Sequence, residues 1–164
     1  MPGNDTASTT VKHNPNIFEK NLYIKMFLES KGANYLDNLG VSFKEIKLVS
    51  SWLNEQGRNQ TVGLHNHRSV KGEFDQISGV FYVKVPKNGG NIRFQRPGYD
   101  SFNCIWPDKK DNSLFLEMDE TNSPEWWMPS MNNILYLFPS WLSHWVEPNL
   151  NKKENRISIS FNMV

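Results

Sequence analysis

The four histidines of this 164-residue chain are the side chains most suited to binding a metal. His65 and His67 are two residues apart, and side chains at that spacing on a strand project from one face. His144 lies much later, just before another strand-like run, and His13 falls in a polar N-terminal segment. Imidazole binds Fe, Zn, Cu and Ni alike, so residue type leaves the metal open. The pattern predicts a three-histidine metal centre; the alternative is that each imidazole is an ordinary polar side chain.

The last predicted strand carries the second group with chemical potential. From Arg156 to Met163 polar and apolar residues alternate, so one face of the strand is polar and the other apolar. A surface strand would show the same pattern, with its polar face in solvent. If the polar face instead lines a cavity, Arg156 and Ser158 point into it together. A guanidinium and a neighbouring hydroxyl suit a carboxylate ligand.

Short strand-like runs separated by turn residues fill the chain from about residue 45 to its end. Residues 1–13 are expected to be disordered. Asn14-Pro15 is predicted to start a helix that ends near Gly32, followed by a short helical piece stopped by Gly40. Many strands after a helical start indicate one mainly β domain over 14–164, a jelly roll with helical support from 14–44 and a β core from 45–164. The expected strands are Ile46–Leu53, Val62–His67, Ile77–Val85, Ile92–Gln95, Leu114–Met118, Ile134–Phe138, His144–Glu147 and Arg156–Met163.

The bulk composition excludes some classes of partner. The net charge is +1, from 18 basic and 17 acidic residues, which gives no electrostatic case for nucleic acid or an anionic membrane. The single cysteine, Cys104, rules out an internal disulfide and fits a reducing compartment. The sequence has no run of apolar residues long enough for a membrane span, and no signal peptide is expected at its start. A cytoplasmic protein is expected, with a homodimer as one option for its assembly.

Four motifs together resemble a known family. They are His65-x-His67, Ser78-Gly-Val-Phe-Tyr82, Phe138-Pro-Ser-Trp-Leu-x-His144 and Arg156-Ile-Ser158-Ile-Ser-Phe-Asn162. This set resembles small 2-oxoglutarate-Fe(II) oxygenases of bacteria and tailed phages, which are similar to the prolyl 4-hydroxylase type of double-stranded β-helix. The resemblance covers about residues 45–164 and is most specific over 133–162. For a phage-encoded member, the expected location is the host cytoplasm.

The resemblance implies a role for each motif residue. His65, His67 and His144 would hold Fe(II), while Arg156, Ser158 and Tyr82 would hold the distal carboxylate of 2-oxoglutarate. The implied reaction is oxidation of a substrate with 2-oxoglutarate and O₂ as co-substrates and succinate and CO₂ as co-products. For Tyr82, between apolar neighbours, the alternative is a plain core aromatic.

One position departs from the family pattern. The superfamily usually has Asp or Glu where this chain has His67. Glu73 or Asp75, in a predicted loop, could supply a carboxylate instead, but strand geometry favours His67 because it lies beside His65. Two other functions stay open: a cupin-like three-histidine metalloenzyme that does not use 2-oxoglutarate, and a non-enzymatic β-sandwich binding module.

The substrate is expected to meet the irregular segment 97–130, since loops at the barrel mouth usually select it in this superfamily. Trp106, Trp126 and Trp127 lie there, and adjacent tryptophans on one strand cannot both point inward. Analogy with prolyl hydroxylases favours a peptide or protein side chain as substrate.

Overall fold

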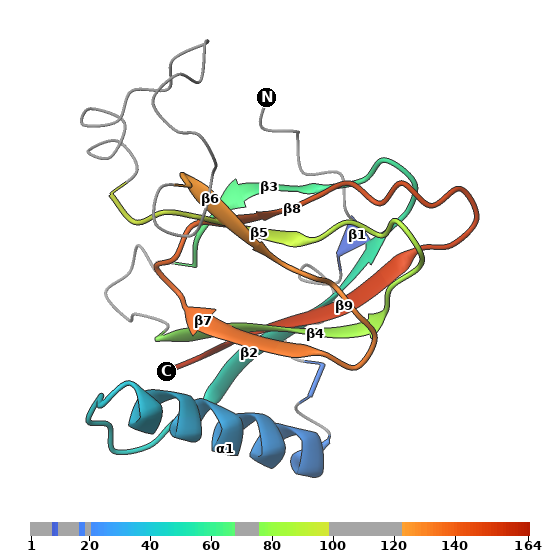
Figure 1. Ribbon diagram of the computed structural model, residues 1–164. Helices are drawn as coiled ribbons and strands as arrows, with labels where there is room; N and C mark the ends of the chain where they lie inside the picture. Colours follow the sequence, from blue (N-terminus) through green and yellow to red (C-terminus); the bar gives the residue numbers. More distant parts are fainter. Residues whose placement is uncertain (1–7, 10–16, 19–20, 68–75, 99–122) are drawn as a thin grey trace.

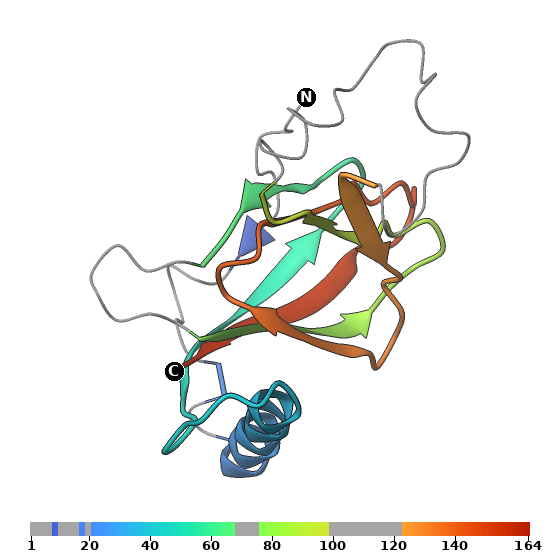
Figure 2. The ribbon, with the colours of Figure 1, turned by 60° about the vertical axis from the view of Figure 1, so that its left-hand side comes forward.

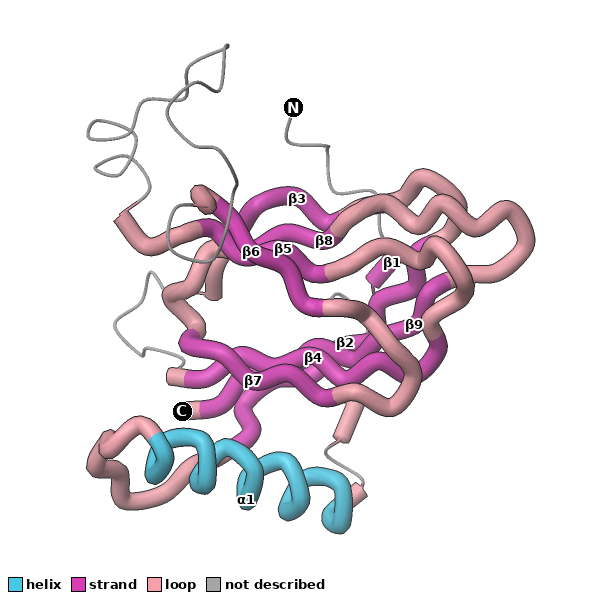
Figure 3. The backbone as a smooth tube through the Cα atoms, in the orientation of Figure 1, coloured by secondary structure: helices cyan, strands magenta, loops and turns pink. Residues whose placement is uncertain are grey.

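Two antiparallel sheets face each other, and one helix lies against the outer face of the larger sheet (Figures 1 and 3). The computed structural model describes residues 8–9, 17–18, 21–67, 76–98 and 123–164. The larger sheet has the order β1-β2-β9-β4-β7, formed by Ser8–Thr9, Leu48–Gln56, Arg156–Met163, Ile77–Lys84 and Leu135–Pro139. The smaller sheet has the order β3-β8-β5-β6, formed by Val62–His65, His144–Val146, Ile92–Gln95 and Glu125–Met128. This arrangement confirms the predicted jelly roll with helical support outside it.

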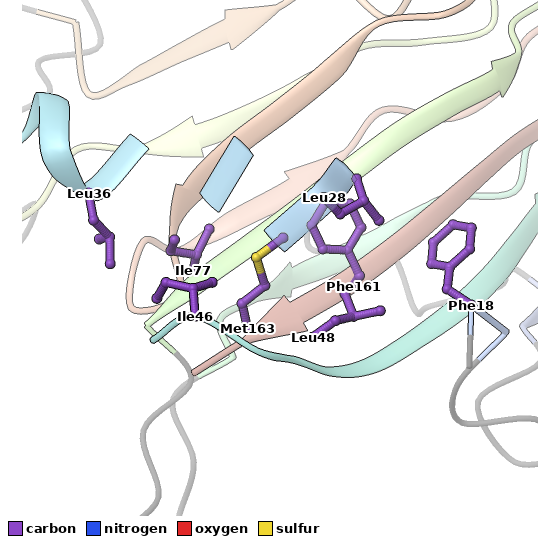
Figure 4. Packing of buried hydrophobic residues seen from close by; sticks show 8 residues of the cluster. All are labelled: Phe18, Leu28, Leu36, Ile46, Leu48, Ile77, Phe161 and Met163. Atoms are coloured by element: carbon purple, nitrogen blue, oxygen red, sulfur yellow. The ribbon is translucent and has the colours of Figure 1, made fainter. Parts of the chain in front are cut away.

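The alternation of β9 separates two buried regions. Its apolar residues Phe161 and Met163 pack on the helix side of the sheet (Figure 4). Its polar residues Arg156, Ser158 and Asn162 are also buried, although they point the opposite way, towards the smaller sheet. The polar face of β9 is therefore an interior surface and not a solvated one. The core on the helix side is completed by Phe18, Leu28, Leu36, Ile46, Leu48 and Ile77.

Helix α1 runs from Leu22 to Asn38, beneath the larger sheet in both ribbon views (Figures 1 and 2). Asn21 caps its start, because its side-chain oxygen accepts from the Ile24 amide at 3.2 Å. The helix ends where Gly40 adopts φ +69° and Val41 N donates to Leu36 O at 3.0 Å, a Schellman arrangement.

The predicted helix boundaries were therefore partly wrong. The helix does not end at Gly32 but passes through it. A Cβ at Gly32 would lie 2.6 Å from Met163 Sδ, so glycine is there to let the helix approach the sheet. The expected start at Asn14-Pro15 falls outside the described residues, as does most of the segment 1–13, of which Ser8–Thr9 form β1.

Most predicted strands are confirmed to within a few residues, and β5 and β9 match their predicted bounds. The predicted strand Ile46–Leu53 ended too early, because β2 continues to Gln56. The two strands β1 and β6 were not predicted. The expected strand at Leu114–Met118 lies outside the described residues. Within the part of the chain that is described, no helix is long and apolar enough to cross a bilayer.

Candidate metal centre and the adjoining cavity

Three histidines meet on the inner side of the smaller sheet. His65 is the last residue of β3 and His144 the first of β8, and the two are paired in the antiparallel register. His67 lies just past β3, where its backbone N–H donates to Ser140 O at 2.9 Å. One potential ligand atom from each imidazole lies within 4.8 Å of the others. The predicted convergence of His65, His67 and His144 is present in the structure.

Backbone carbonyls set the tautomer of two of these rings. His65 Nδ1 is 2.7 Å from Gly63 O, and His144 Nδ1 is 2.9 Å from Leu142 O. A carbonyl oxygen only accepts, so each Nδ1 must carry the proton. The Nε2 atoms then keep their lone pairs, which is the form in which histidine binds a metal.

Burial disfavours protonation of two of these imidazoles, those of His67 and His144. It lowers the pKa of His144 to about 3 and that of His67 to about 4, and the nearby His65 adds to both shifts. Both imidazoles are therefore neutral near pH 7, ready to act as ligands without first losing a proton. The three imidazoles, of which His144 is buried and His65 and His67 are partly buried, offer nitrogen ligands that suit Fe(II). Glu73 and Asp75, the alternative ligands, lie outside the described residues.

A cavity extends from the histidines between the two sheets. Its volume is about 60 Å³, room for a few water molecules, so a larger ligand requires lining side chains to move. The larger sheet supplies a polar wall, because Asn54 pairs with Ser158, and Ser158 pairs with Tyr82, across neighbouring strands. The residues that line the cavity are Trp52, Asn54, Gln56, Val62, His65, His67, Gly79, Val80, Tyr82, Ile92, Phe138, His144, Val146, Ser158 and Ser160.

Tyr82 belongs both to the core and to the cavity wall. Its side chain is 1% exposed and packs in a cluster with Ile92 and Phe138 between the sheets. Burial raises the pKa of its phenol, so the hydroxyl keeps its proton near neutral pH. The two interpretations of Tyr82, core aromatic and cavity residue, therefore hold together.

Arg156 is fully buried, and all its hydrogen-bond donors are matched by protein oxygens. Nε and Nη2 donate to Gln56 Oε1 at 3.0 and 2.7 Å, and Nη2 also donates to Glu147 O at 3.1 Å. Nη1 donates to Gly89 O and Gly90 O at 2.6 and 2.9 Å. Burial lowers the pKa of this guanidinium. Arg156 does not itself line the cavity, whereas its partner Gln56 does.

Gln56 is the site residue that the sequence analysis missed. Its side chain is 2% exposed, and among the described residues its Nε2 is a buried donor without a hydrogen-bond partner. Asn54 and Gln56 show the same two-residue spacing as Arg156 and Ser158. This spacing would have placed both on one face had the predicted strand, which ended at Leu53, been extended to include them.

The expected tryptophan arrangement is confirmed on β6. Trp126 stacks on Phe94 with ring centroids 6.1 Å apart, while Trp127 is 52% exposed. Trp106 and most of the segment 97–130 lie outside the described residues.

Residues 50–162, more than half of the chain, match the model of a protein family described as "Putative 2OG-Fe(II) oxygenase". No curated protein matches the chain. Similar solved structures include a Pseudomonas putida prolyl-4-hydroxylase, with 13% identity, a TM-score of 0.56, and coverage of 99% of this chain and 76% of that one. A viral collagen prolyl hydroxylase from Paramecium bursaria Chlorella virus-1 has 9% identity, a TM-score of 0.60, and coverage of 98% and 79%.

A third similar structure is an oxidoreductase of the 2OG-Fe(II) oxygenase family from Burkholderia pseudomallei, with 12% identity and a TM-score of 0.55. The match includes 79% of this chain and 49% of that protein, so this chain spans about half the length of that relative. At these identities the likeness shows the fold, which is the expected double-stranded β-helix.

Proposed function

The chain belongs to the 2OG-Fe(II) oxygenase family, and from this premise we propose that it oxidises a substrate at an Fe(II) centre held by His65, His67 and His144. The convergence of the three imidazoles, with ligand atoms within 4.8 Å, is the observation that carries the proposal. The family uses Fe(II) and 2-oxoglutarate as cofactors. When bound, these groups would supply the oxidation of a substrate C–H bond by O₂, with one oxygen atom going to the product and the other to succinate while the C1 carboxyl of 2-oxoglutarate leaves as CO₂.

The groups proposed to bind the metal and those proposed to bind 2-oxoglutarate lie on different sheets. The smaller sheet carries the imidazoles of His65 and His144, with His67 just past β3, and the larger sheet supplies the polar wall. We assign the distal carboxylate of 2-oxoglutarate to the end of the cavity that holds Tyr82 and Ser158. Arg156 supplies the positive charge at that end, and the Tyr82 hydroxyl, kept protonated by burial, is a hydrogen-bond donor for the carboxylate.

The proposed substrate is a peptide or protein side chain. Two of the structures that share the fold are named as prolyl hydroxylases, one of them acting on collagen by its name. The exposed Trp127 on β6 offers an aromatic surface for an extended chain. Hydroxylation is the proposed form of the oxidation.

The first test is anaerobic titration of the metal-free protein with Fe(II) and then with 2-oxoglutarate. The expected result is one Fe(II) per chain, followed by the visible charge-transfer band of the Fe(II) chelate. His144→Ala should abolish Fe(II) binding. His67→Phe should do so while keeping the ring that lies 5.6 Å from the Trp52 ring. His13→Ala, which removes the remaining histidine, is the matched control and should bind both ligands normally.

Each other outcome selects a different function. Fe(II) binding without the band on adding 2-oxoglutarate would favour the cupin-like enzyme that does not use this cosubstrate. Absence of metal binding would mean that the histidines are structural and that the chain is a binding module. If His67→Phe retains Fe(II), a carboxylate such as Glu73 or Asp75 is the third ligand.

A further inference from the structure

The amide of Gln56 connects the buried Arg156 guanidinium with the cavity. Its Oε1 accepts two hydrogen bonds from Arg156, from Nε at 3.0 Å and from Nη2 at 2.7 Å. A guanidinium only donates, so the oxygen of the amide must be the atom that faces Arg156. The nitrogen is consequently on the other side of the amide, and Gln56 is a lining residue of the cavity. The orientation of this side chain is fixed by its neighbour.

The amide nitrogen of Gln56 lacks an acceptor. Within the described part of the chain, Nε2 is buried without a hydrogen-bond partner, on a side chain that is 2% exposed. A buried donor without an acceptor is destabilising, and proteins rarely keep one without a reason. An acceptor brought by a ligand would remove the cost.

Arg156 meanwhile has no free donor, and among the described residues no carboxylate forms a salt bridge with it, although the charge of Glu147 acts on it from a greater distance. Its five N–H contacts all end on neutral oxygens, those of the Gln56 amide and of the backbone at Gly89, Gly90 and Glu147. None of the salt bridges formed between described residues involves it. A buried cation in contact with neutral groups alone favours an anion nearby. Its hydrogen bonds to Oε1 also polarise the Gln56 amide, which strengthens Nε2 as a donor.

We propose that Gln56, and not Arg156, donates the direct hydrogen bond to the distal carboxylate of 2-oxoglutarate. Arg156 is a positioning residue that holds the Gln56 amide with its nitrogen towards the cavity. The carboxylate is received by the Gln56 amide together with the hydroxyls of Tyr82 and Ser158, which line the same cavity. This inference rests on the proposed function, because it names the residue that recognises the cosubstrate of that site.

The decisive variant is Gln56→Met, which keeps the length of the side chain and removes the amide. Binding of 2-oxoglutarate and of 2-oxobutyrate is measured in the Fe(II)-loaded protein without O₂. Both probes offer the same chelating end, and 2-oxobutyrate lacks the distal carboxylate. Gln56→Met should weaken 2-oxoglutarate about tenfold or more and leave 2-oxobutyrate within about twofold. Gln76→Met, the same substitution at an exposed residue outside the cavity, is the control and should change neither.

The opposite result has a clear meaning. Suppose that Arg156 contacts the distal carboxylate directly. Gln56→Met would then free the Nε donor and one Nη2 donor of Arg156, and 2-oxoglutarate would bind as tightly as before or more tightly. That result would overturn the inference while leaving the proposed function intact. If the wild-type protein binds Fe(II) but not 2-oxoglutarate, the proposed function itself fails.

Arg156→Lys tests the positioning role. The substitution keeps the positive charge but cannot make both hydrogen bonds to Gln56 Oε1. It should therefore weaken the binding of 2-oxoglutarate, while Fe(II) and 2-oxobutyrate bind normally. Added to Gln56→Met, it should cause little further loss, because both substitutions disable the same hydrogen bond. Additive losses would contradict the inference.

A measurement on the wild-type protein covers the case in which Gln56→Met does not fold. With ¹⁵N-labelled glutamine and Zn(II) in place of Fe(II), the side-chain amide protons of Gln56 should move downfield on addition of 2-oxoglutarate and not of 2-oxobutyrate. Gln56→Glu, whose carboxylate is matched to Arg156, identifies the resonance by its loss. An amide signal that stays in place at saturation would overturn the inference.

Discussion

The imidazoles of His65 on β3 and His144 on β8 make the same local contact with the backbone. In each, Nδ1 contacts the carbonyl two residues earlier, Gly63 O for His65 and Leu142 O for His144. This contact orients the ring and leaves Nε2 as the metal-binding atom. His67, which is not held in this way, packs between the rings of Trp52 and His144, at centroid distances of 5.6 and 5.3 Å. The ligand set is therefore oriented before a metal arrives.

Acidification should destabilise the metal-free protein. The folded pKa values of His67 and His144, about 4 and about 3, lie below the ordinary value of 6.5. At a pH between the folded and the unfolded pKa, these two imidazoles are protonated in the unfolded chain but not in the folded chain. The free energy of unfolding therefore falls as the pH drops below 6.5, and it continues to fall until about pH 3. The expected loss is on the order of a few kcal/mol.

Urea unfolding of the metal-free protein at pH 7 and pH 4.5 would measure this loss. His67→Phe is the comparison, since it removes one of the two titrating imidazoles and retains a ring. The variant should lose less stability than the wild type over the same interval. Equal losses would show that His67 does not titrate as its burial requires.

Strand pairing, more than any single side chain, places the polar wall of the cavity. β9 lies between β2 and β4, so Ser158 has Asn54 on one side and Tyr82 on the other. Gly79 on β4 is paired with Phe161 on β9. Because glycine has no Cβ, the side chains of Phe161 and Leu137 can pack directly against it on the helix side of the sheet. A Cβ at Gly79 would lie 2.2 Å from Phe161 Cζ and 2.9 Å from Leu137 Cδ2.

Gly79→Ala should therefore destabilise the protein by about 1–3 kcal/mol, because the added methyl overpacks a well-filled core. Gly57→Ala is the control: its nearest contacts would be at 3.4 Å, an ordinary van der Waals distance. It should change the free energy of unfolding by about 0.5 kcal/mol or less. Equal effects of the two substitutions, measured by urea unfolding, would contradict the packing argument.

Across the whole molecule, the metal ligands and the polar wall belong to different sheets. His65 and His144 lie on strands of the smaller sheet, and Tyr82 and Ser158 on strands of the larger one. A cosubstrate that touches both groups would tie the sheets together, whereas a metal alone would brace the smaller sheet.

Hydrogen exchange followed by mass spectrometry should detect this difference. Zn(II) alone should slow exchange mainly around β3 and β8. Adding 2-oxoglutarate at a hundred times its Kd should extend the protection to β2 and β9, with slowing up to about a hundredfold for amides that exchange through global opening. Adding 2-oxobutyrate should not extend it. Protection confined to the smaller sheet with both ligands would place the cosubstrate away from the polar wall.

Local patterns in the sequence determined much of this protein. The alternation of β9 predicted its bounds and its two faces, and the spacing of His65 and His67 predicted that the two side chains share a face. The four motifs identified the family and the double-stranded β-helix, and the 50–162 match confirms the family. These features depend on neighbours along the chain, which is why periodicity and motif spacing predict them.

Tertiary structure alone decided which groups meet. Nothing local indicates that Gln56 accepts from Arg156, 100 residues away, or that Gly89 O lies against the same guanidinium, 67 residues away. It also decided that the helix continues through Gly32, because contact with the sheet outweighs the low helix propensity of glycine. Burial and hydrogen-bond partners arise from segments brought together by folding. Sequence therefore predicted the three histidines, Tyr82, Arg156 and Ser158 as candidates. Only the packing of the two sheets brought Gln56 to the cavity with a donor that has no partner among the described residues.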